Sequence, residues 1–271
     1  CLMKNLNSIW DKDGNIMNYI SAVHTDVGIK KKTNQDSLFM ETAATDYGQV
    51  LLGVICDGMG GLAKGEVASA ILIKAFAGWF HTEFPKLLYT GIDPNRLRES
   101  WTKLILEQNK KITDYGLDCH VSLGTTAVAL LLIDNLYYAV NVGDSRIYLL
   151  KDNMQQITVD QTVVQREMEL GRMTPEQARK SPQRNVLLQC VGASSVIAPD
   201  FYVGEFASDS IFMMCSDGFR HVITPEEFFQ RLNPQALTTQ EVMKESAVYF
   251  TELNKKRREE DNISVALIRA Y

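Results

Sequence analysis

Residues 50–61 read VLLGVICDGMGG, an apolar run that ends on an aspartate and a cluster of glycines. A run that is apolar at nearly every position, as Val50–Cys56 is, predicts a strand covered on both faces. Asp57 then stands at the end of rigid backbone, and the glycines after it permit turns that bring a ligand close to main-chain groups. The stretch alone also fits a tight turn with an acidic cap. It lacks the Lys-Ser/Thr pair and the GxGxxG spacing of phosphate-binding loops.

Four further acidic motifs stand along the chain: Thr33-Asn34-Gln35-Asp36, Gly143-Asp144-Ser145-Arg146, Ser216-Asp217-Gly218 and Asp261-Asn262. Asp36 opens an apolar run, and the other motifs stand at the end of one or just beyond it. Any one of them alone fits a solvated loop carboxylate. Together they predict that the five carboxylates lie close together and bind cations. Without cations, neighbouring carboxylates would repel one another and some would have to stay protonated.

Oxygen ligands of this kind favour Mg²⁺ or Mn²⁺ over zinc. Two such ions bridged by one carboxylate lower the pKa of a bound water and present it as hydroxide. The four histidines show no metal-ligand spacing, and ordinary structural roles are expected for His81 and His221.

The composition is that of an ordinary soluble globular protein, with 271 residues of which 45% are hydrophobic and 23% charged. A net charge of −5 with scattered Lys and Arg argues against nucleic-acid binding. No apolar stretch approaches the roughly 18 residues that a membrane-spanning helix needs, so no membrane association is expected. Five cysteines without CxxC spacing fit reduced thiols in the cytoplasm. Met3 is expected to be the natural first residue.

Hydrophobic periodicity predicts strands over 19–27, 37–42, 50–56, 125–133, 136–142, 146–150, 155–158, 201–205, 210–215 and 263–268. It predicts helices over 65–84, 94–115 and 239–258, and a further helix that begins at residue 224. This order predicts an α+β domain with hairpin-connected antiparallel sheets rather than βαβ units. Asp160–Asn185 is expected to be a polar, partly helical insertion in which Thr174-Pro175-Glu176 starts a helix. No linker divides the chain, so residues 1–271 are expected to form a single domain.

The ordered motifs NQD (34–36), DGMGG (57–61), GTT (124–126), NVGDSR (141–146), SDG (216–218) and DN (261–262) resemble the metal-dependent serine/threonine phosphatases of type 2C, the PPM family, in their bacterial form. The resemblance spans about Ser21 to Ala270. It implies a four-layer α-β-β-α sandwich of two antiparallel sheets flanked by pairs of helices. Residues 174–176 with 181–185 look like the family's flap beside the active site, here about 160–190.

The same resemblance implies roles for single residues. Asp57 would bridge two Mn²⁺ or Mg²⁺ ions, with the Gly58 carbonyl on one of them, and Asp217 and Asp261 would bind the other ion. Asp36 would orient the water molecules on the metals.

Four further positions complete the implied site. Asn262 would support the metal ligands from behind, and Asp144 would share a weaker third ion with Asp217. Gln183 and Arg184 would belong to the substrate flap.

Two positions depart from the family pattern. Lys31 stands where many members carry an arginine that grips the substrate phosphate, and it supplies charge without the bidentate fork of a guanidinium. Met59 stands where animal members have a histidine proposed as general acid, so the proton for the leaving group must come from elsewhere.

The expected activity is hydrolysis of phosphoserine and phosphothreonine on proteins by a metal-bridging hydroxide. No phosphoenzyme is expected, since Cys56 and Cys215 lack the Cys-x5-Arg loop of cysteine phosphatases. The resemblance implies a bacterial serine/threonine kinase as counterpart, and a monomer is the default expectation. A phosphatase-like scaffold without turnover is the main alternative, with Lys31 in its favour. A carboxylate-metal nuclease is disfavoured because a basic groove is missing.

Overall fold

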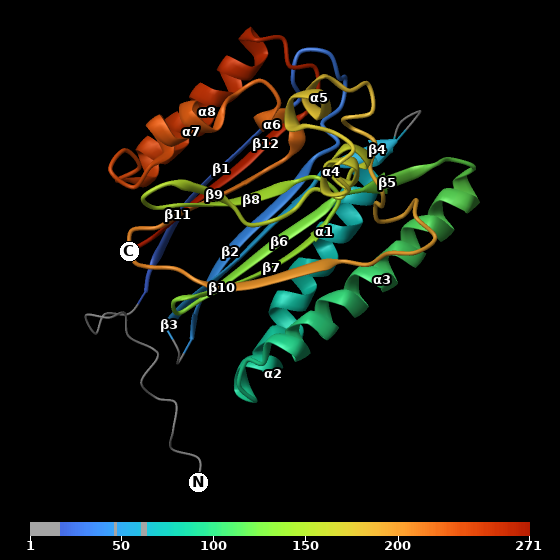
Figure 1. The fold of residues 1–271 in the computed structure, drawn as a ribbon. Helices are drawn as coiled ribbons and strands as arrows, with labels where there is room; N and C mark the ends of the chain where they lie inside the picture. The colour runs from blue at the N-terminus through green and yellow to red at the C-terminus, as the bar shows by residue number, and fades with distance from the viewer. Residues whose placement is uncertain (1–16, 46–47, 61–63) are drawn as a thin grey trace.

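The computed structural model describes residues 17–45, 48–60 and 64–271; Met3 and Gly61 lie outside the described residues. Two five-stranded antiparallel sheets lie against each other in the middle of the molecule, with helices on both outer faces (Figure 1). The predicted four-layer α-β-β-α sandwich is therefore confirmed. No described helix is both long and apolar enough to cross a membrane.

The first sheet contains the two ends of the described chain. Its strands, in spatial order, are β1 (Tyr19–Asp26), β12 (Ile263–Ala270), β11 (Ile211–Cys215), β8 (Arg146–Leu150) and β9 (Met154–Gln156). The second sheet has the order β10 (Asp200–Glu205), β7 (Leu136–Val142), β6 (Ala127–Ile133), β3 (Gly48–Cys56) and β2 (Ser37–Thr45). The Asp134-Asn135 turn joins β6 to β7 as a hairpin, as the sequence predicts.

Strand β3 shows why its sequence is apolar throughout. Side chains alternate across a strand, so its two faces belong to different cores. Leu51 and Ile55 lie in the core between the two sheets, whereas Leu52 and Val54 lie in the core beneath the helices. The strand is thus covered on both faces, as predicted.

The second sheet is covered by α1 (Gly65–Thr82), α2 (Phe84–Tyr89) and α3 (Pro94–Cys119). Asp93 caps α3 by accepting hydrogen bonds from the backbone N–H groups of Asn95 (2.8 Å) and Arg96 (3.1 Å). The segment around Pro85, predicted to be a loop, is instead the short helix α2. Proline is compatible with the first turn of a helix because the N–H that it lacks has no partner there.

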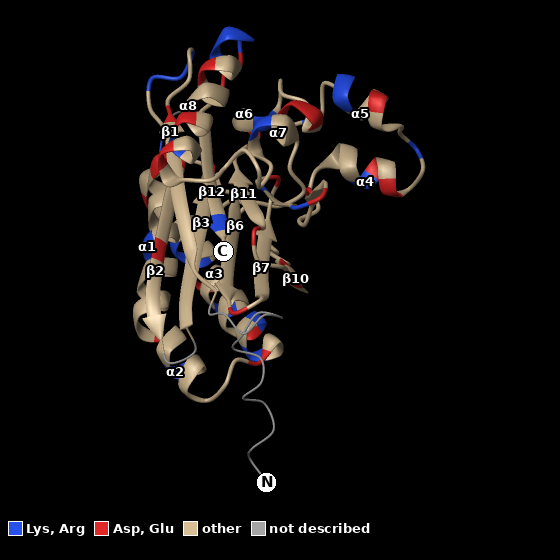
Figure 2. Ribbon diagram, turned by 90° about the vertical axis from the view of Figure 1, so that its left-hand side faces the viewer, with Lys and Arg blue, Asp and Glu red and all other residues tan. Residues whose placement is uncertain are grey.

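The first sheet is covered by α6 (Asp217–Arg220), α7 (Pro225–Leu232) and α8 (Gln240–Lys256). The helix predicted from residue 224 begins with a capping box, since the Thr224 hydroxyl accepts from the Glu227 N–H and the Glu227 carboxylate accepts from the Thr224 N–H. The insertion between β9 and β10 carries α4 (Val163–Glu169) and α5 (Pro175–Lys180), which project from the sandwich (Figure 2).

The glycine-rich turn after β3 is a strand as well. β4 (Gly58–Gly60) pairs antiparallel with β5 (Leu123–Thr125), so the run predicted as one strand from Thr125 to Ile133 divides at Thr126 into β5 and β6. Strand propensity does not predict β4. This strand forms because it pairs with a partner more than 60 residues away, and not because of its own three residues.

Candidate active site

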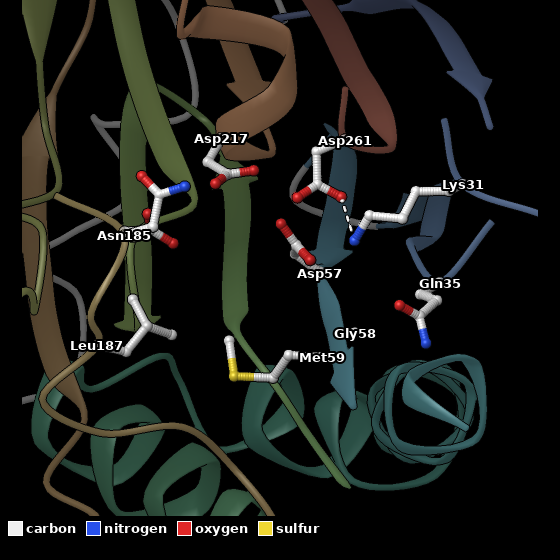
Figure 3. A pocket seen from close by; sticks show the side chains of 10 residues that line it. Lys31, Gln35, Asp57, Gly58, Met59, Asn185, Leu187, Asp217 and Asp261 are labelled. Carbon is white, nitrogen blue, oxygen red and sulfur yellow. Dashed lines mark ion pairs between the residues drawn. The ribbon is translucent and has the colours of Figure 1, made fainter. Parts of the chain in front are cut away.

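A pocket of about 320 Å³ opens at the edge of the sandwich where the loops after several strands meet (Figure 3). It is lined by Lys31, Gln35, Asp57, Gly58, Met59, Asp144, Asn185, Leu187, Asp217 and Asp261. Asp57 follows β3, Asp217 follows β11 and Asp261 precedes β12, so both sheets contribute. The side chains of these three aspartates point toward a common space (Figure 3). Four of the five aspartates predicted to converge thus line one pocket, and the motif of the fifth contributes Gln35.

The fifth aspartate, Asp36, does not line this pocket, and only 8% of its surface is exposed. Within the described part of the chain neither of its carboxylate oxygens has a hydrogen-bond partner. Burial raises the pKa of Asp36 to about 7, the hydroxyls of Ser264 and Ser216 partly oppose the shift, and the charges of Asp217 and Asp261 add to it. Burial and the neighbouring carboxylates likewise raise the pKa of Asp57 well above its usual range. The arrangement therefore favours a cation that would relieve this repulsion.

The backbone of Asp57 is held by the GTT motif. The Thr126 N–H donates to the Asp57 carbonyl over 2.8 Å, and the Thr126 hydroxyl accepts from the Asp57 N–H over 3.0 Å. Gly58 follows in a space that admits no side chain, because an added Cβ would lie 2.3 Å from the Gly65 carbonyl oxygen and 2.5 Å from that of Gln35. These contacts fix the carboxylate and the next peptide group relative to the sheet.

Lys31 is the cationic side chain of the pocket. Its Nζ lies 2.9 Å from Oδ1 of Asp261, and 40% of its side chain remains exposed. Burial opposes the shift, but the hydrogen bond to Asp261 and the charges of Asp57 and Asp217 raise the pKa of Lys31, so it stays protonated. Lys31 is therefore available to bind an anion at the pocket mouth.

Asn262 ties the Lys31 loop to the start of β12. Its Oδ1 accepts from the Gln35 N–H over 2.9 Å, and its Nδ2 donates to the carbonyls of Val27 (2.9 Å) and Thr33 (3.2 Å). Because Asn262 adjoins Asp261, the same turn positions the carboxylate and the lysine that faces it. This arrangement fits the supporting role that the resemblance implies.

A buried ion-pair network lies beside Asp144, and the sequence does not predict it. Arg146 binds Asp160 through two hydrogen bonds of 2.7 Å, and Arg220 reaches the carboxylates of both Asp144 (3.3 Å) and Asp160 (3.4 Å). Arg146 stands within a motif the sequence singles out, but its partner lies fourteen residues away and carries no local signal.

His221 also has a more specific position than the ordinary role expected for it. Its Nε2 lies 3.4 Å from Oδ2 of Asp217, and its Nδ1 lies 3.4 Å from Oε2 of Glu259. Burial opposes protonation, but Glu259 and Asp217 together raise the pKa of His221. His81, by contrast, lies on α1 with its ring beside Phe80 and forms an exposed contact with Glu41. The position of His221 one turn after Asp217 is the signal that could have revealed it.

Residues 28–255 match the family described as Protein phosphatase 2C. The chain belongs to the protein phosphatase 2C family. It is 31% identical over 206 residues to the protein phosphatase PhpP of Streptococcus pneumoniae, covering 75% of this chain and 80% of that protein. It is also 31% identical over 221 residues to the serine/threonine phosphatase stp of Listeria innocua, covering 79% and 82% of the two chains.

A solved structure extends the likeness to the fold. The catalytic domain of the serine/threonine protein phosphatase PstP, in complex with two manganese ions, superposes with a TM-score of 0.76 at 28% identity, covering 94% of this chain and 99% of that one. The resemblance inferred from the motifs is thus confirmed, and the protein is a serine/threonine protein phosphatase of the 2C type.

The pocket of this phosphatase fits hard divalent ions. Its polar lining consists mainly of carboxylates, and the buried Asp217 Oδ1 has no hydrogen-bond partner among the described residues. In the described ranges no three His, Cys, Asp or Glu side chains form a ready-made cage for one ion. Mg²⁺ does not need such a cage, since it keeps several water ligands and binds through one or two carboxylates.

Of the flap motif at 181–185, only the last residue lines the pocket. Asn185 and Leu187 line the pocket, whereas Gln183 and Arg184 are exposed and do not belong to its lining. A β-bridge between Thr162 and Leu187 closes the base of the flap. Met59 lines the pocket floor with a thioether, which cannot donate a proton.

Proposed function

We propose that this protein removes phosphate from phosphoserine and phosphothreonine residues of proteins, using two Mn²⁺ or Mg²⁺ ions in the pocket around Asp57. The observation that carries the proposal is the convergence of Asp57, Asp217 and Asp261 beside Lys31. A family whose solved member PstP holds two manganese ions supports the same interpretation.

Each side chain has a distinct task in this proposal. Asp57 and the Gly58 carbonyl, with Asp217 and Asp261, would hold the ions at the end of the sandwich. Bound there, such ions supply Lewis acidity and an activated water for hydrolysis of a phosphate ester. Asp36, buried close enough to Asp57 for their charges to interact, would orient water within the site through its carboxylate oxygens.

Lys31 binds the substrate phosphate. Its ammonium group lies at the pocket mouth, paired with Asp261, and 40% of its side chain is open to solvent. A phosphate entering the pocket meets this charge first, and the charge offsets the repulsion from the surrounding aspartates. An ammonium acts as a point charge, so it orients the phosphate less strictly than a bidentate guanidinium would.

The substrates are proteins phosphorylated by a serine/threonine kinase, and the protein acts as a monomeric, cytoplasmic enzyme of a bacterial signalling pair. The whole chain works as one catalytic domain, with the flap around residues 160–190, including Gln183 and Arg184, facing the substrate protein. Acidic and basic residues are interspersed along the ribbon in Figure 2, and the net charge is −5, which disfavours nucleic acid as the substrate.

The proposal is tested by hydrolysis of a phosphothreonine peptide with Mn²⁺, with EDTA, and with Asp57→Asn. We expect metal-dependent turnover that EDTA abolishes and that falls by a factor on the order of 100 or more in the variant. Cys215→Ser should retain turnover, since no thiol participates. Bound Mn²⁺ without turnover would instead support a catalytically silent scaffold, and nicking of a supercoiled plasmid would support a nuclease.

A further inference from the structure

The family resemblance implies a third ion between Asp144 and Asp217, but side chains of the chain itself already face both carboxylates, and the one that faces Asp144 is a permanently charged guanidinium. Arg220 Nη2 lies 3.3 Å from Oδ2 of Asp144 and 2.9 Å from its backbone carbonyl oxygen. His221 Nε2 lies 3.4 Å from Oδ2 of Asp217. Two consecutive residues thus meet the two acidic groups that a third ion would have to share.

We propose that Arg220 takes the position of the third cation, so that this phosphatase binds two divalent ions and not three. Asp144 then serves as the anionic partner of Arg220 and not as a metal ligand. The inference rests on the proposed function, because it specifies the metal content of the same site.

The guanidinium is fixed where it lies. Only 10% of the Arg220 side chain is exposed, and the same nitrogen that faces Asp144 also lies 3.4 Å from Oδ2 of Asp160. Asp160 is in turn bound at both oxygens by Arg146, at 2.7 Å each. To make room for an ion, Arg220 would have to break its contacts with two buried carboxylates. Its own buried position gives the guanidinium no direct hydration in exchange, so this displacement is costly.

The charge of Arg220 cannot be removed by deprotonation, since a guanidinium stays protonated throughout the working pH range. A divalent ion bound to Asp144 would therefore lie beside a permanent like charge in a buried, weakly screened location. Asp217 opens α6 and Arg220 closes it, so the helix that supplies a ligand of the core ions also supplies the guanidinium. Arg220 is in this sense a positioning residue, which links the metal ligand loop to Asp160 at the base of the flap.

The test counts bound ions on the full chain by Mn²⁺ titration, following the EPR signal of the free aqueous ion. We expect two ions on the wild type, and the same number on Asp144→Asn. Arg220→Gln is expected to gain a third ion, with a Kd lower by on the order of tenfold or more than that of any third binding event on the wild type. The double variant Arg220→Gln/Asp144→Asn should return to two.

Three outcomes of the titration would contradict the two-ion inference. Three ions on the wild type, with one lost in Asp144→Asn, would overturn the inference while leaving the proposed function intact. Arg220→Gln with only two ions would overturn it as well. Fewer than two ions on the wild type would contradict the proposed function and this inference together. If Arg220→Gln does not fold, the comparison of the wild type with Asp144→Asn still decides.

Discussion

Asp36 lies among Asp217 and Asp261 with its carboxylate buried, and this makes the metal-free protein sensitive to pH. An acid whose pKa is raised on folding, here from 3.8 to about 7, binds more protons in the folded state. Folding stability from this group is therefore lost as the pH rises through that interval. In EDTA, Asp36→Asn should lose less stability than the wild type between about pH 4 and about pH 7, by on the order of 4 kcal/mol.

Urea unfolding at a series of pH values measures this difference. Saturating Mn²⁺ is the control, because bound cations favour the ionised carboxylates and should remove most of the pH-dependent loss in the wild type. Identical pH profiles of the two proteins in EDTA would contradict the electrostatic account of Asp36.

Lys31 allows a second test at the residue scale. Lys31→Met should raise KM for a phosphothreonine peptide by on the order of tenfold, with a smaller effect on kcat, because it removes a charge that binds the phosphate in ground state and transition state alike. Lys31→Arg should restore or improve KM. Steady-state kinetics measures both.

The neighbouring Lys32 provides the matched control, since it is exposed in the same basic turn and does not line the pocket. Lys32→Met should leave KM within about twofold of the wild type. An equal rise in KM for both methionine variants would show that the turn acts through its general charge and not through Lys31.

The sequence predicts the ligand-bearing aspartates because each stands beside an apolar run that fixes its backbone. It does not predict the role of Arg220, since its partners Asp144 and Asp160 come from distant parts of the chain. For His221 only one partner, Asp217, is local, and the other, Glu259, is distant. The direction of a charged side chain in the pocket depends on these long-range contacts and not on local pattern.

At the scale of elements, the short strand β4 depends on a close approach of backbones. A Cβ at Gly58 would lie within 2.5 Å of backbone oxygens or carbons of Gln35 and Gly65, so Gly58→Ala should destabilise the fold by about 2 kcal/mol and weaken Mn²⁺ binding. Gly78 in the middle of α1 has nothing within 4 Å of the same atom. Gly78→Ala should therefore stabilise the protein by about 0.5–1 kcal/mol.

Chemical unfolding measures both glycine variants under the same conditions. Equal effects of the two substitutions, in sign and size, would contradict the role given to the backbone contacts of Gly58.

The contact between α7 and the end of α8 gives a pH-dependent prediction. Arg257 holds the carboxylate of Glu227 and lowers its pKa from 4.5 to about 2, with the Thr224 N–H assisting. A depressed pKa contributes stability above the unfolded value of 4.5 that is lost as the pH falls toward 2. Glu227→Gln keeps an oxygen for the Thr224 cap but removes the ion pair.

We expect the Tm of Glu227→Gln to lie below that of the wild type at pH 7, and the two values to converge as the solution is acidified. Thermal melts down to the lowest pH at which both proteins fold measure this. Parallel curves over the whole range would show that the pair contributes no pH-dependent stability.

Elements with a local signal are predicted well from the sequence, and those without one are not. The helix starts at Thr174, Thr224 and Asp93 carry capping residues and are confirmed. By contrast, α2 has no amphipathic length of its own, and β4 has no strand propensity. Both form because neighbouring elements provide the contacts.

At the scale of the whole molecule, the sandwich follows from strands that are apolar on both faces and helices that are apolar on one. The core between the sheets and the two cores under the helices bring loops from both sheets to one edge. The pocket lies at this edge, so the fold itself gathers aspartates that are up to about 200 residues apart in the chain.

The central claim is that these aspartates form a two-metal phosphatase centre. Anomalous diffraction from crystals grown with Mn²⁺ tests it most directly. We predict two manganese peaks in the pocket, with Asp57 in contact with both and Asp217 and Asp261 beside one, and no peak at Asp144. A map without manganese between Asp57, Asp217 and Asp261 would contradict the account.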